Sequence, residues 1–156
     1  MTYLILNPSF ENEGFAEWVQ SGMQLQGNTA FSIKKGNTYA EKWTGQGFAV
    51  GDAFVRQTLK KVPLGTYRLT VAAQNIQEGT PSKVQTGACI FAGNQKMAVG
   101  IRKNYVLEFV VASGEVTIGF LAEKASGNWI CCDNFRLEYI DSNPEAVMAK
   151  MQSLID

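Results

Sequence analysis

Alternation of apolar and polar side chains is the strongest pattern in this chain. It is clearest in three segments, whose apolar positions are Tyr67, Leu69, Val71 and Ala73; Tyr105, Leu107, Phe109 and Val111; and Val116, Ile118 and Phe120. Side chains two residues apart on a β-strand point to the same face, so each segment predicts a strand with one buried face. Such strands, separated by turn residues, predict an all-β domain built as an antiparallel β-sandwich or barrel.

The same pattern can be followed along the whole chain. It predicts strands at residues 3–7, 30–34, 39–43, 54–59, 66–74, 84–92, 96–99, 104–112, 115–122 and 129–140. Turn residues at 92–95 and 113–115 predict hairpins, and Pro63-Leu64-Gly65 marks a further turn. The most loop-like stretches are 44–53 and 75–83, and binding residues tend to lie on loops carried by a rigid scaffold.

The last expected strand contains a carboxylate among apolar side chains. Residues 131, 133, 135, 137 and 139 are Cys, Asp, Phe, Leu and Tyr, so Asp133 is expected to point into the core. A buried carboxylate is costly unless it is paired, hydrogen-bonded or bound to a metal. Asp133 therefore either accepts hydrogen bonds from backbone donors or holds a cation together with an acid such as Glu11.

After residue 140 the pattern becomes helical. Residues 141–145 offer an N-cap, a proline in the first turn and an early acid. Apolar residues then recur at helical spacing, at Val147, Met148, Met151, Leu154 and Ile155. We expect residues 1–140 to form the β-domain. Residues 141–156 are expected to form an amphipathic helix that packs back on this domain or, as we favour, begins a linker to a next domain.

Composition narrows the function classes. The 156 residues include 14 Lys and Arg against 14 Asp and Glu, so the basic surplus needed for nucleic-acid binding is missing. No apolar run is long enough to span a membrane. The absence of histidine removes His-dependent triads, His-ligated zinc and His general bases. Catalysis by carboxylates alone stays open, but Asp52, Glu78, Glu115 and Glu123 show no spacing that would place two of them across a cleft.

The N-terminus and the cysteines carry little functional signal. Residues 1–10 lack the basic start and apolar stretch of a signal peptide, and we expect the native targeting segment to lie outside this sequence.

Cys89, Cys131 and Cys132 fit no metal-binding spacing. We expect mostly buried, inert thiols, with a bridge from Cys89 to Cys131 or to Cys132 as the alternative.

Three segments, taken in order, resemble a known fold group. Asn7-Pro8-Ser9-Phe10-Glu11, followed by Gly14 and Trp18, resembles the opening strand of galactose-binding-like jelly rolls, which include several families of carbohydrate-binding modules. Residues 57–71 are similar to a central strand of that group, and residues 128–137 are similar to its last strand. The resemblance covers residues 3–140 and is nearest to accessory modules attached to secreted glycoside hydrolases of Bacteroidetes.

This resemblance implies a jelly-roll β-sandwich that is not an enzyme and that tethers a secreted polysaccharide-degrading enzyme to glycan. The expected partners are a polysaccharide or oligosaccharide and a neighbouring catalytic domain, with no nucleic acid and no membrane span. The expected location is secreted, periplasmic or at the cell surface.

The resemblance also implies a structural Ca²⁺ held by Glu11 and Asp133, with backbone carbonyls completing the shell. Ca²⁺ takes six to eight oxygen ligands, and one carboxylate from each terminal segment would join the two. The alternative is that Asp133 satisfies backbone donors and Glu11 is solvated.

Aromatic side chains near loops are the candidate ligand-binding residues. Sugar-binding modules place flat aromatic faces against the C–H faces of sugars and polar groups on the hydroxyls. We expect Trp18 in the core, Trp43 beside its glycine-rich loop as the first stacking platform, and Trp129 with the adjoining Asn128 as the second choice. The further candidates are Tyr39, Glu41 and Arg102. The fold offers a concave-face site and a loop-tip site, and the sequence does not choose between them.

Two rival functions fit the same sequence. The first is a structural β-sandwich that packs against a catalytic neighbour and has no ligand of its own. The second is a small glycosidase or lyase, which would turn over polysaccharide by itself.

Overall fold

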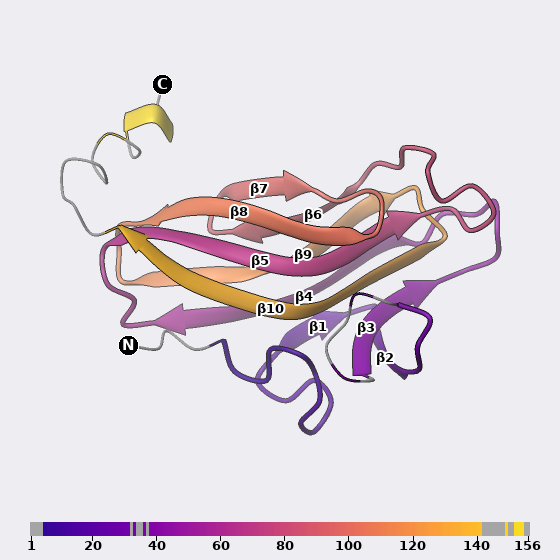
Figure 1. Ribbon diagram of the computed structural model, residues 1–156, viewed down its shortest axis with the longest axis horizontal. Helices are drawn as coiled ribbons and strands as arrows, with labels where there is room; N and C mark the ends of the chain where they lie inside the picture. The colour runs from indigo at the N-terminus through magenta and orange to yellow at the C-terminus, as the bar shows by residue number, and fades with distance from the viewer. Residues whose placement is uncertain are drawn as a thin grey trace.

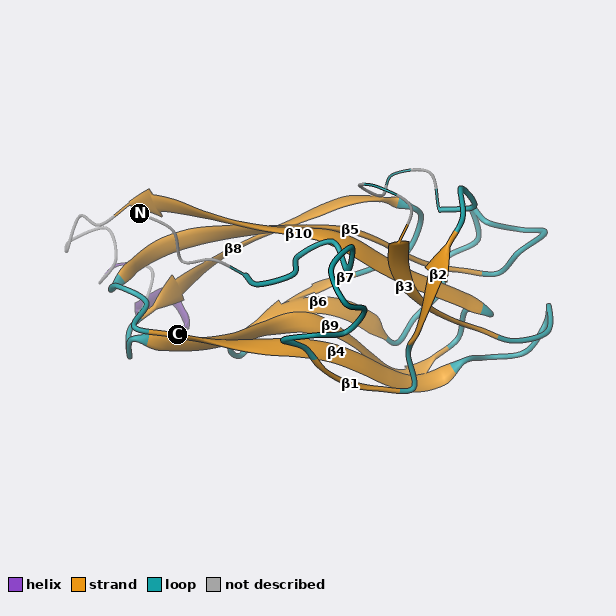
Figure 2. Cartoon of the chain, turned by 90° about the horizontal axis from the view of Figure 1, so that it is seen from below, coloured by secondary structure: helices purple, strands orange, loops and turns teal. Residues whose placement is uncertain are grey.

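The chain folds into two stacked antiparallel sheets, seen edge-on in Figure 2. The structure is a computed structural model and describes residues 5–31, 33, 36, 38–141, 149 and 152–154. Sheet A has the order β1 (Val19–Ser21), β4 (Gly51–Lys60), β9 (Glu115–Ala125), β6 (Ala88–Ala92) and β7 (Gln95–Ala98). Sheet B has the order β2 (Gln24–Gly27), β3 (Thr38–Trp43), β10 (Trp129–Asp141), β5 (Gly65–Ile76) and β8 (Lys103–Val111), as Figure 1 shows. The predicted all-β sandwich is therefore confirmed.

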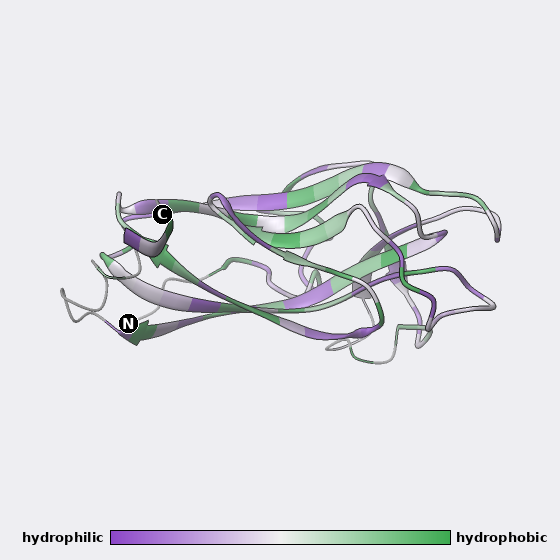
Figure 3. Cartoon of the chain, turned by 90° about the horizontal axis from the view of Figure 1, so that it is seen from above, coloured by the Kyte–Doolittle hydropathy of each residue, from purple (hydrophilic) through white to green (hydrophobic). Residues whose placement is uncertain are grey.

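The main core lies between the sheets and follows the predicted alternation. The apolar positions of β5, β8 and β9 are buried in one cluster, with Tyr67, Leu69 and Val71 fully buried. Figure 3 shows the resulting change between hydrophilic and hydrophobic segments along the strands. This agreement follows from the two-residue period of a strand, which sends every second side chain between the sheets.

The turns follow the prediction only in part. Residues 92–95 join β6 to β7 in an antiparallel hairpin of sheet A, as expected. Residues 113–115 do not close a hairpin, because β8 belongs to sheet B and β9 to sheet A. The expectation was wrong here because turn residues mark a reversal of the chain without specifying which sheet the next strand joins.

Two expected strands are replaced by other structure. Residues 5–7 of the expected strand 3–7 are not in a strand, and the Gln57 side chain bonds Leu6 instead, accepting from its N–H at 2.7 Å and donating to its carbonyl at 2.9 Å. In the expected strand 30–34, the described residues 30, 31 and 33 are also outside strands. Positions 3, 4, 32 and 34 lie outside the described residues. The strands β1 and β2 were not predicted, because their mostly exposed side chains give no clear alternation.

The opening segment is tied to the closing strand by backbone and aromatic contacts. The N–H of Phe135 donates to the carbonyl of Pro8 at 3.0 Å. The rings of Phe10, Trp18 and Phe135 pack with centroids 4.8 to 6.2 Å apart, and Trp18 donates from Nε1 to the Asn7 carbonyl at 2.8 Å. Trp18 is only 8% exposed, which confirms its predicted place in the core.

A β-bulge in β10 changes the side to which its residues point. The pairing with β5 shifts register between Asp133 and Arg136, and Asn134 has a left-handed φ of 53°. Cys132 and Phe135 therefore both face the main core, whereas Cys131 belongs to a second cluster with Phe31, Tyr39 and Ala72. Asp133 is fully buried, but it pairs with Ala72 and lies on the side of that second cluster. The prediction that residues 131 to 139 share one core-facing stripe was wrong, because a bulge inserts one residue and reverses the alternation.

The remaining expectations concern the cysteines and the tail. Cys89, Cys131 and Cys132 are free thiols, and the last two are buried, so neither alternative bridge is formed. Leu154 lies in a short helical turn at 152–154 and is 46% exposed. The other expected positions of the helical stripe, Val147, Met148, Met151 and Ile155, lie outside the described residues. No helix among the described residues has the length and apolar character that crossing a membrane requires.

Candidate functional site

Two tryptophans lie side by side at the loop end of sheet B. Trp129 at the start of β10 pairs with Trp43 at the end of β3 and with Ile76 at the end of β5. Directly paired residues point to the same face, and here that is the outer face of sheet B, away from sheet A. We call Trp43, Trp129 and Ile76 the tryptophan row. Trp43 is 59% exposed, Trp129 is half-buried and Ile76 is buried, so solvent exposure decreases along the row from Trp43 to Ile76.

Glu41 fixes the indole of Trp129 through a hydrogen bond. Its carboxylate is buried and accepts a hydrogen bond from Nε1 of Trp129 at 2.8 Å. The other carboxylate oxygen accepts from the side-chain amides of Gln24 at 3.3 Å and Gln26 at 3.1 Å. A buried carboxylate is tolerated when several donors satisfy it, and these three contacts meet that condition.

Arg102 lies over the ring of Trp129. Its guanidinium carbon lies 5.2 Å from the ring centroid of Trp129 and 5.4 Å from that of Phe31, within cation–π range of both. Its Nε donates to Oε1 of the buried Gln74 at 2.6 Å, and Nη1 donates to the Ala30 carbonyl at 3.0 Å. The indole of Trp129 is therefore fixed by Glu41 and Arg102, and Trp43 carries the more accessible aromatic surface.

Two other sequence candidates are buried next to the row. Tyr39 is fully buried and its hydroxyl contacts Oδ1 of Asn28 at 2.7 Å; burial, followed by the charge of Glu41, raises the pKa of Tyr39 to about 12. Asn128 is also fully buried, and its amide donates to the Thr44 carbonyl and to Glu78 at 3.0 Å each while accepting from the Glu78 N–H at 2.7 Å. In this geometry Tyr39 and Asn128 support the surface residues and join the surrounding loops, so neither is placed to touch a ligand at the surface.

A pocket of about 600 Å³ adjoins the row at Ile76. Its walls combine apolar side chains with an arginine and a carboxylate: Ile76, Glu78, Gly79, Pro81, Ser82, Ile101 and Arg102. This volume is within the range of ligand-binding clefts, and a mostly apolar lining with few polar groups is typical of them. The structure thus gathers Trp43, Trp129, Glu41 and Arg102 at one place, beside a loop that the sequence marked at 75–83.

Sequence reasoning missed the residues that support this place. Gln24 and Gln26 lie on a short strand that was not predicted, and Gln74 and Ile76 lie at the end of a strand that was expected to stop at residue 74. The only local sign was the alternation Gln24-Leu25-Gln26, which is too short to indicate a strand. Their roles depend on pairing between strands far apart in the sequence.

The two expected calcium ligands lie in the opening segment and the closing strand. Glu11 accepts the N–H of Thr38 on Oε1 at 2.8 Å and is exposed, whereas Asp133 is buried. The Pro8–Phe135 hydrogen bond brings the two segments together. Among the described residues no group of three or more His, Cys, Asp or Glu side chains could hold a metal, so a cation here would need backbone oxygens as well.

No protein-family model matches this sequence. No curated protein matches it either. Among solved structures, TmCBM61 in complex with β-1,4-galactotriose is 19% identical, with a TM-score of 0.66 over 90% of this chain and 99% of that chain. A family 35 carbohydrate-binding module from Clostridium thermocellum is 11% identical, with a TM-score of 0.54 over 80% of this chain and 94% of that one.

Enzymes share the same fold. The Stig cyclase Fisc from Fischerella sp. TAU is 18% identical, with a TM-score of 0.60 over 88% of this chain and 98% of that chain. At these identities the likeness concerns the fold alone. The chain has the jelly-roll β-sandwich found in carbohydrate-binding modules, and the same sandwich also supports cyclases.

Proposed function

We propose that this domain is a non-catalytic carbohydrate-binding module whose ligand stacks on Trp43 at the tryptophan row. The observation that carries the proposal is the pairing of Trp43 with Trp129, which places an exposed indole beside one that is fixed by Glu41 and Arg102. Fixed aromatic surface lowers the entropy lost on binding, which favours recognition of a flat sugar face.

The pocket beyond the row supplies the polar groups. Neighbouring strands are ~4.8 Å apart, so Trp43 on β3 and the pocket wall at Ile76 on β5 are separated by ~10 Å of sheet. A sugar on Trp43 can therefore extend past Trp129 toward Arg102 and Glu78, whose charged groups suit the hydroxyls of a following sugar.

Three of the four acids considered for catalysis have other partners. Oδ1 of Asp52 accepts the N–H of Lys124 at 2.8 Å, Glu115 pairs with Lys60 at 3.3 Å, and Glu78 accepts from Asn128. These contacts support a binding role over a glycosidase or lyase. Attachment to a secreted polysaccharide-degrading enzyme is part of the proposal, and a β-1,4-mannanase from Podospora anserina, of whose chain the match covers 26%, provides a precedent for such an arrangement. An origin in Bacteroidetes stays a prediction.

The proposal is tested by titrating the domain with β-1,4-galactotriose and β-1,4-mannotriose while recording tryptophan fluorescence. We expect a ligand-dependent change that Trp43→Ala abolishes. Leu64→Ala is the control, because Leu64 is 50% exposed and precedes β5 at the end of that strand opposite Ile76. Unchanged glycan affinity in Trp43→Ala would show that the assigned site is wrong. Failure to bind any glycan of a plant and host panel would favour the structural-domain alternative.

We further propose that Glu11 and Asp133 hold a structural Ca²⁺ together with backbone oxygens. The burial of Asp133 and the contact between their two segments support this proposal. Calcium should raise the melting midpoint of the wild-type domain, chelator should reverse the rise, and Asp133→Asn should remove the response. A midpoint unaffected by both calcium and chelator would leave Asp133 as a buried acid satisfied within the protein.

A further inference from the structure

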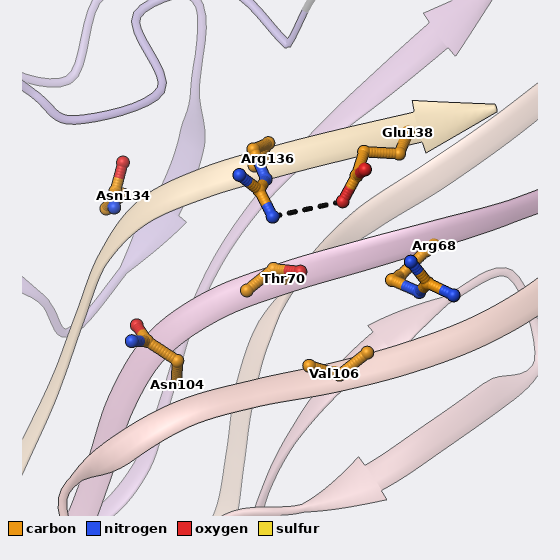
Figure 4. A pocket seen from close by; sticks show the side chains of 7 residues that line it. All are labelled: Arg68, Thr70, Asn104, Val106, Asn134, Arg136 and Glu138. Atoms are coloured by element: carbon orange, nitrogen blue, oxygen red, sulfur yellow. Dashed lines mark ion pairs between the residues drawn. The ribbon is translucent and has the colours of Figure 1, made fainter. Parts of the chain in front are cut away.

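A second cavity lies on the outer face of sheet B, away from the tryptophan row. It has a volume of about 570 Å³, and Figure 4 shows its lining side chains along β10, β5 and β8. We call it the trough, and its lining residues are Arg68, Thr70, Asn104, Val106, Asn134, Arg136 and Glu138. No tryptophan lines the trough, and the second cluster, in which Phe31 packs on Ala72 and Cys131, lies between the trough and the row.

The strand register explains why this face is hollow. Thr70 on the central strand β5 lies between Arg136 on β10 and Val106 on β8, and the neighbouring Arg68 lies between Glu138 and Glu108. The short side chain of Thr70 is thus flanked by longer ones on both sides. Because adjacent strands are ~4.8 Å apart, the two flanks are ~10 Å apart, which leaves a channel along β5.

The bulge in β10 is required for this lining. In a regular strand, residues 132, 134, 136 and 138 would all face the main core with Cys132. The extra residue at Asn134 reverses the alternation, so that Phe135 enters the core and Arg136 and Glu138 point outward. Bulges of this kind redirect side chains and often lie next to binding sites.

The trough is lined by two arginines and one carboxylate, and Glu108, which lies beside Arg68 on β8 at its edge, brings the local charge to balance. Arg136 pairs with Glu138 at 3.0 Å, and Arg68 pairs with Glu108 at 2.9 Å, with every one of these side chains at least 37% exposed. A guanidinium has five N–H donors, so one ion pair leaves donors for a ligand. An anionic ligand would meet two carboxylates beside the two arginines. An uncharged polyhydroxyl ligand, whose groups both donate and accept, matches the arginines, carboxylates and amides together, and Val106, which is 45% exposed, offers a small apolar contact.

We infer that the trough is a second saccharide site, which takes an uncharged stretch of a glycan chain. The inference rests on the proposed function in that both sites bind the same polymer. Two sites on one domain raise the effective concentration of the second contact, so polymer binding becomes stronger than binding of a short oligosaccharide at either site alone.

The test compares three variants by calorimetry with the neutral trisaccharides named above and with the corresponding polymers. Thr70→Tyr fills the trough at a strand position where tyrosine is well tolerated. Thr58→Tyr is the matched control, because Thr58 is an exposed strand residue on the outer face of sheet A. Trp43→Ala removes the first site. Unchanged melting midpoints confirm that the variants fold.

We expect two bound trisaccharides for the wild type and Thr58→Tyr, and one for Thr70→Tyr, which keeps the tryptophan fluorescence response. Trp43→Ala should bind one without that response. Affinity of Thr70→Tyr for the polymer should fall at least ~10-fold.

The outcomes separate the two proposals. Complete loss of binding in Trp43→Ala, or wild-type stoichiometry in Thr70→Tyr, would overturn the trough site and leave the proposed function intact. Binding that survives Trp43→Ala and is lost in Thr70→Tyr would overturn the assignment at the row alone. A trough that binds polygalacturonate but no neutral glycan would overturn the assigned ligand chemistry.

Discussion

The hydrogen bond between Glu41 and Trp129 should contribute to both stability and binding. We consider Trp129→Phe, which keeps an aromatic ring on the outer face of sheet B but removes the indole N–H. Oε1 of Glu41 then loses its 2.8 Å donor while the carboxylate stays buried at 3% exposure. A hydrogen bond to a charged group is worth about 1.5–3 kcal/mol, and the smaller ring adds a packing loss. We expect the free energy of unfolding to fall by about 2–3 kcal/mol.

A double-mutant cycle isolates the pair. Glu41→Gln keeps the shape of the side chain but removes the charge, and it should cost about 1.5–2 kcal/mol. If the two residues act through their hydrogen bond, the double variant should be about 1–2 kcal/mol more stable than the sum of the single losses implies. Urea denaturation of the four proteins gives these values, provided that the denaturant slopes agree.

Measuring trisaccharide binding distinguishes an effect on the orientation of Trp129 from an effect on the stability of the domain alone. Both single variants should weaken trisaccharide binding while the domain stays folded at the assay temperature, because Trp129→Phe removes the indole and Glu41→Gln removes the charged partner that fixes it. Gln26→Ala serves as a control, since it removes one amide donor of Glu41 without touching the tryptophan. Additive effects in the cycle, to within about 0.3 kcal/mol, would refute the claim that Glu41 positions Trp129.

Three further predictions concern the scaffold. The pKa of Tyr39 is raised from 10.0 to about 12, so its contribution to stability is complete below pH 10 and is lost as pH rises from 10 to 12. The Tyr39→Phe variant should therefore lose less stability at alkaline pH than the wild type does, as measured by urea midpoints over a pH series. An unchanged curve would contradict this prediction. Phe135→Ala should lower the free energy of unfolding by about 3–5 kcal/mol in denaturant melts, since its ring packs on Trp18; a loss below about 1 kcal/mol would show that the aromatic cluster is not a main support. Gly119→Ala should prevent regular pairing of β9 with β4, because a Cβ there would collide with the Val55 carbonyl; soluble protein with a wild-type melting midpoint would disprove it.

Most of the sandwich could be predicted from local patterns. Tyr67, Leu69 and Val71 needed only the two-residue period of a strand to be assigned to the core. The fold class followed from such segments because alternation is a property of the strand itself, independent of which strand lies beside it.

The candidate site was predictable as a set of residue types and not as an arrangement. Trp43 and Arg102 could be chosen because exposed aromatic and charged side chains near loops suit sugar recognition. Their relation to Trp129 could not, because it depends on pairing of β3, β10 and β5, which are far apart in the chain. The same holds for Asn128, whose local sequence gives no sign that its amide is used to join loops.

Local patterns along the chain were enough to identify an all-β domain and the apolar positions that fill its core. The place where the alternation reverses depends on the folded structure instead, because the bulge at Asn134 is a property of the pairing between β10 and β5. That single inserted residue places Phe135 in the core and Arg136 on the outer face, and so creates the trough. Local periodicity records which side chains avoid water, whereas the register between distant strands decides which polar side chains meet on a surface.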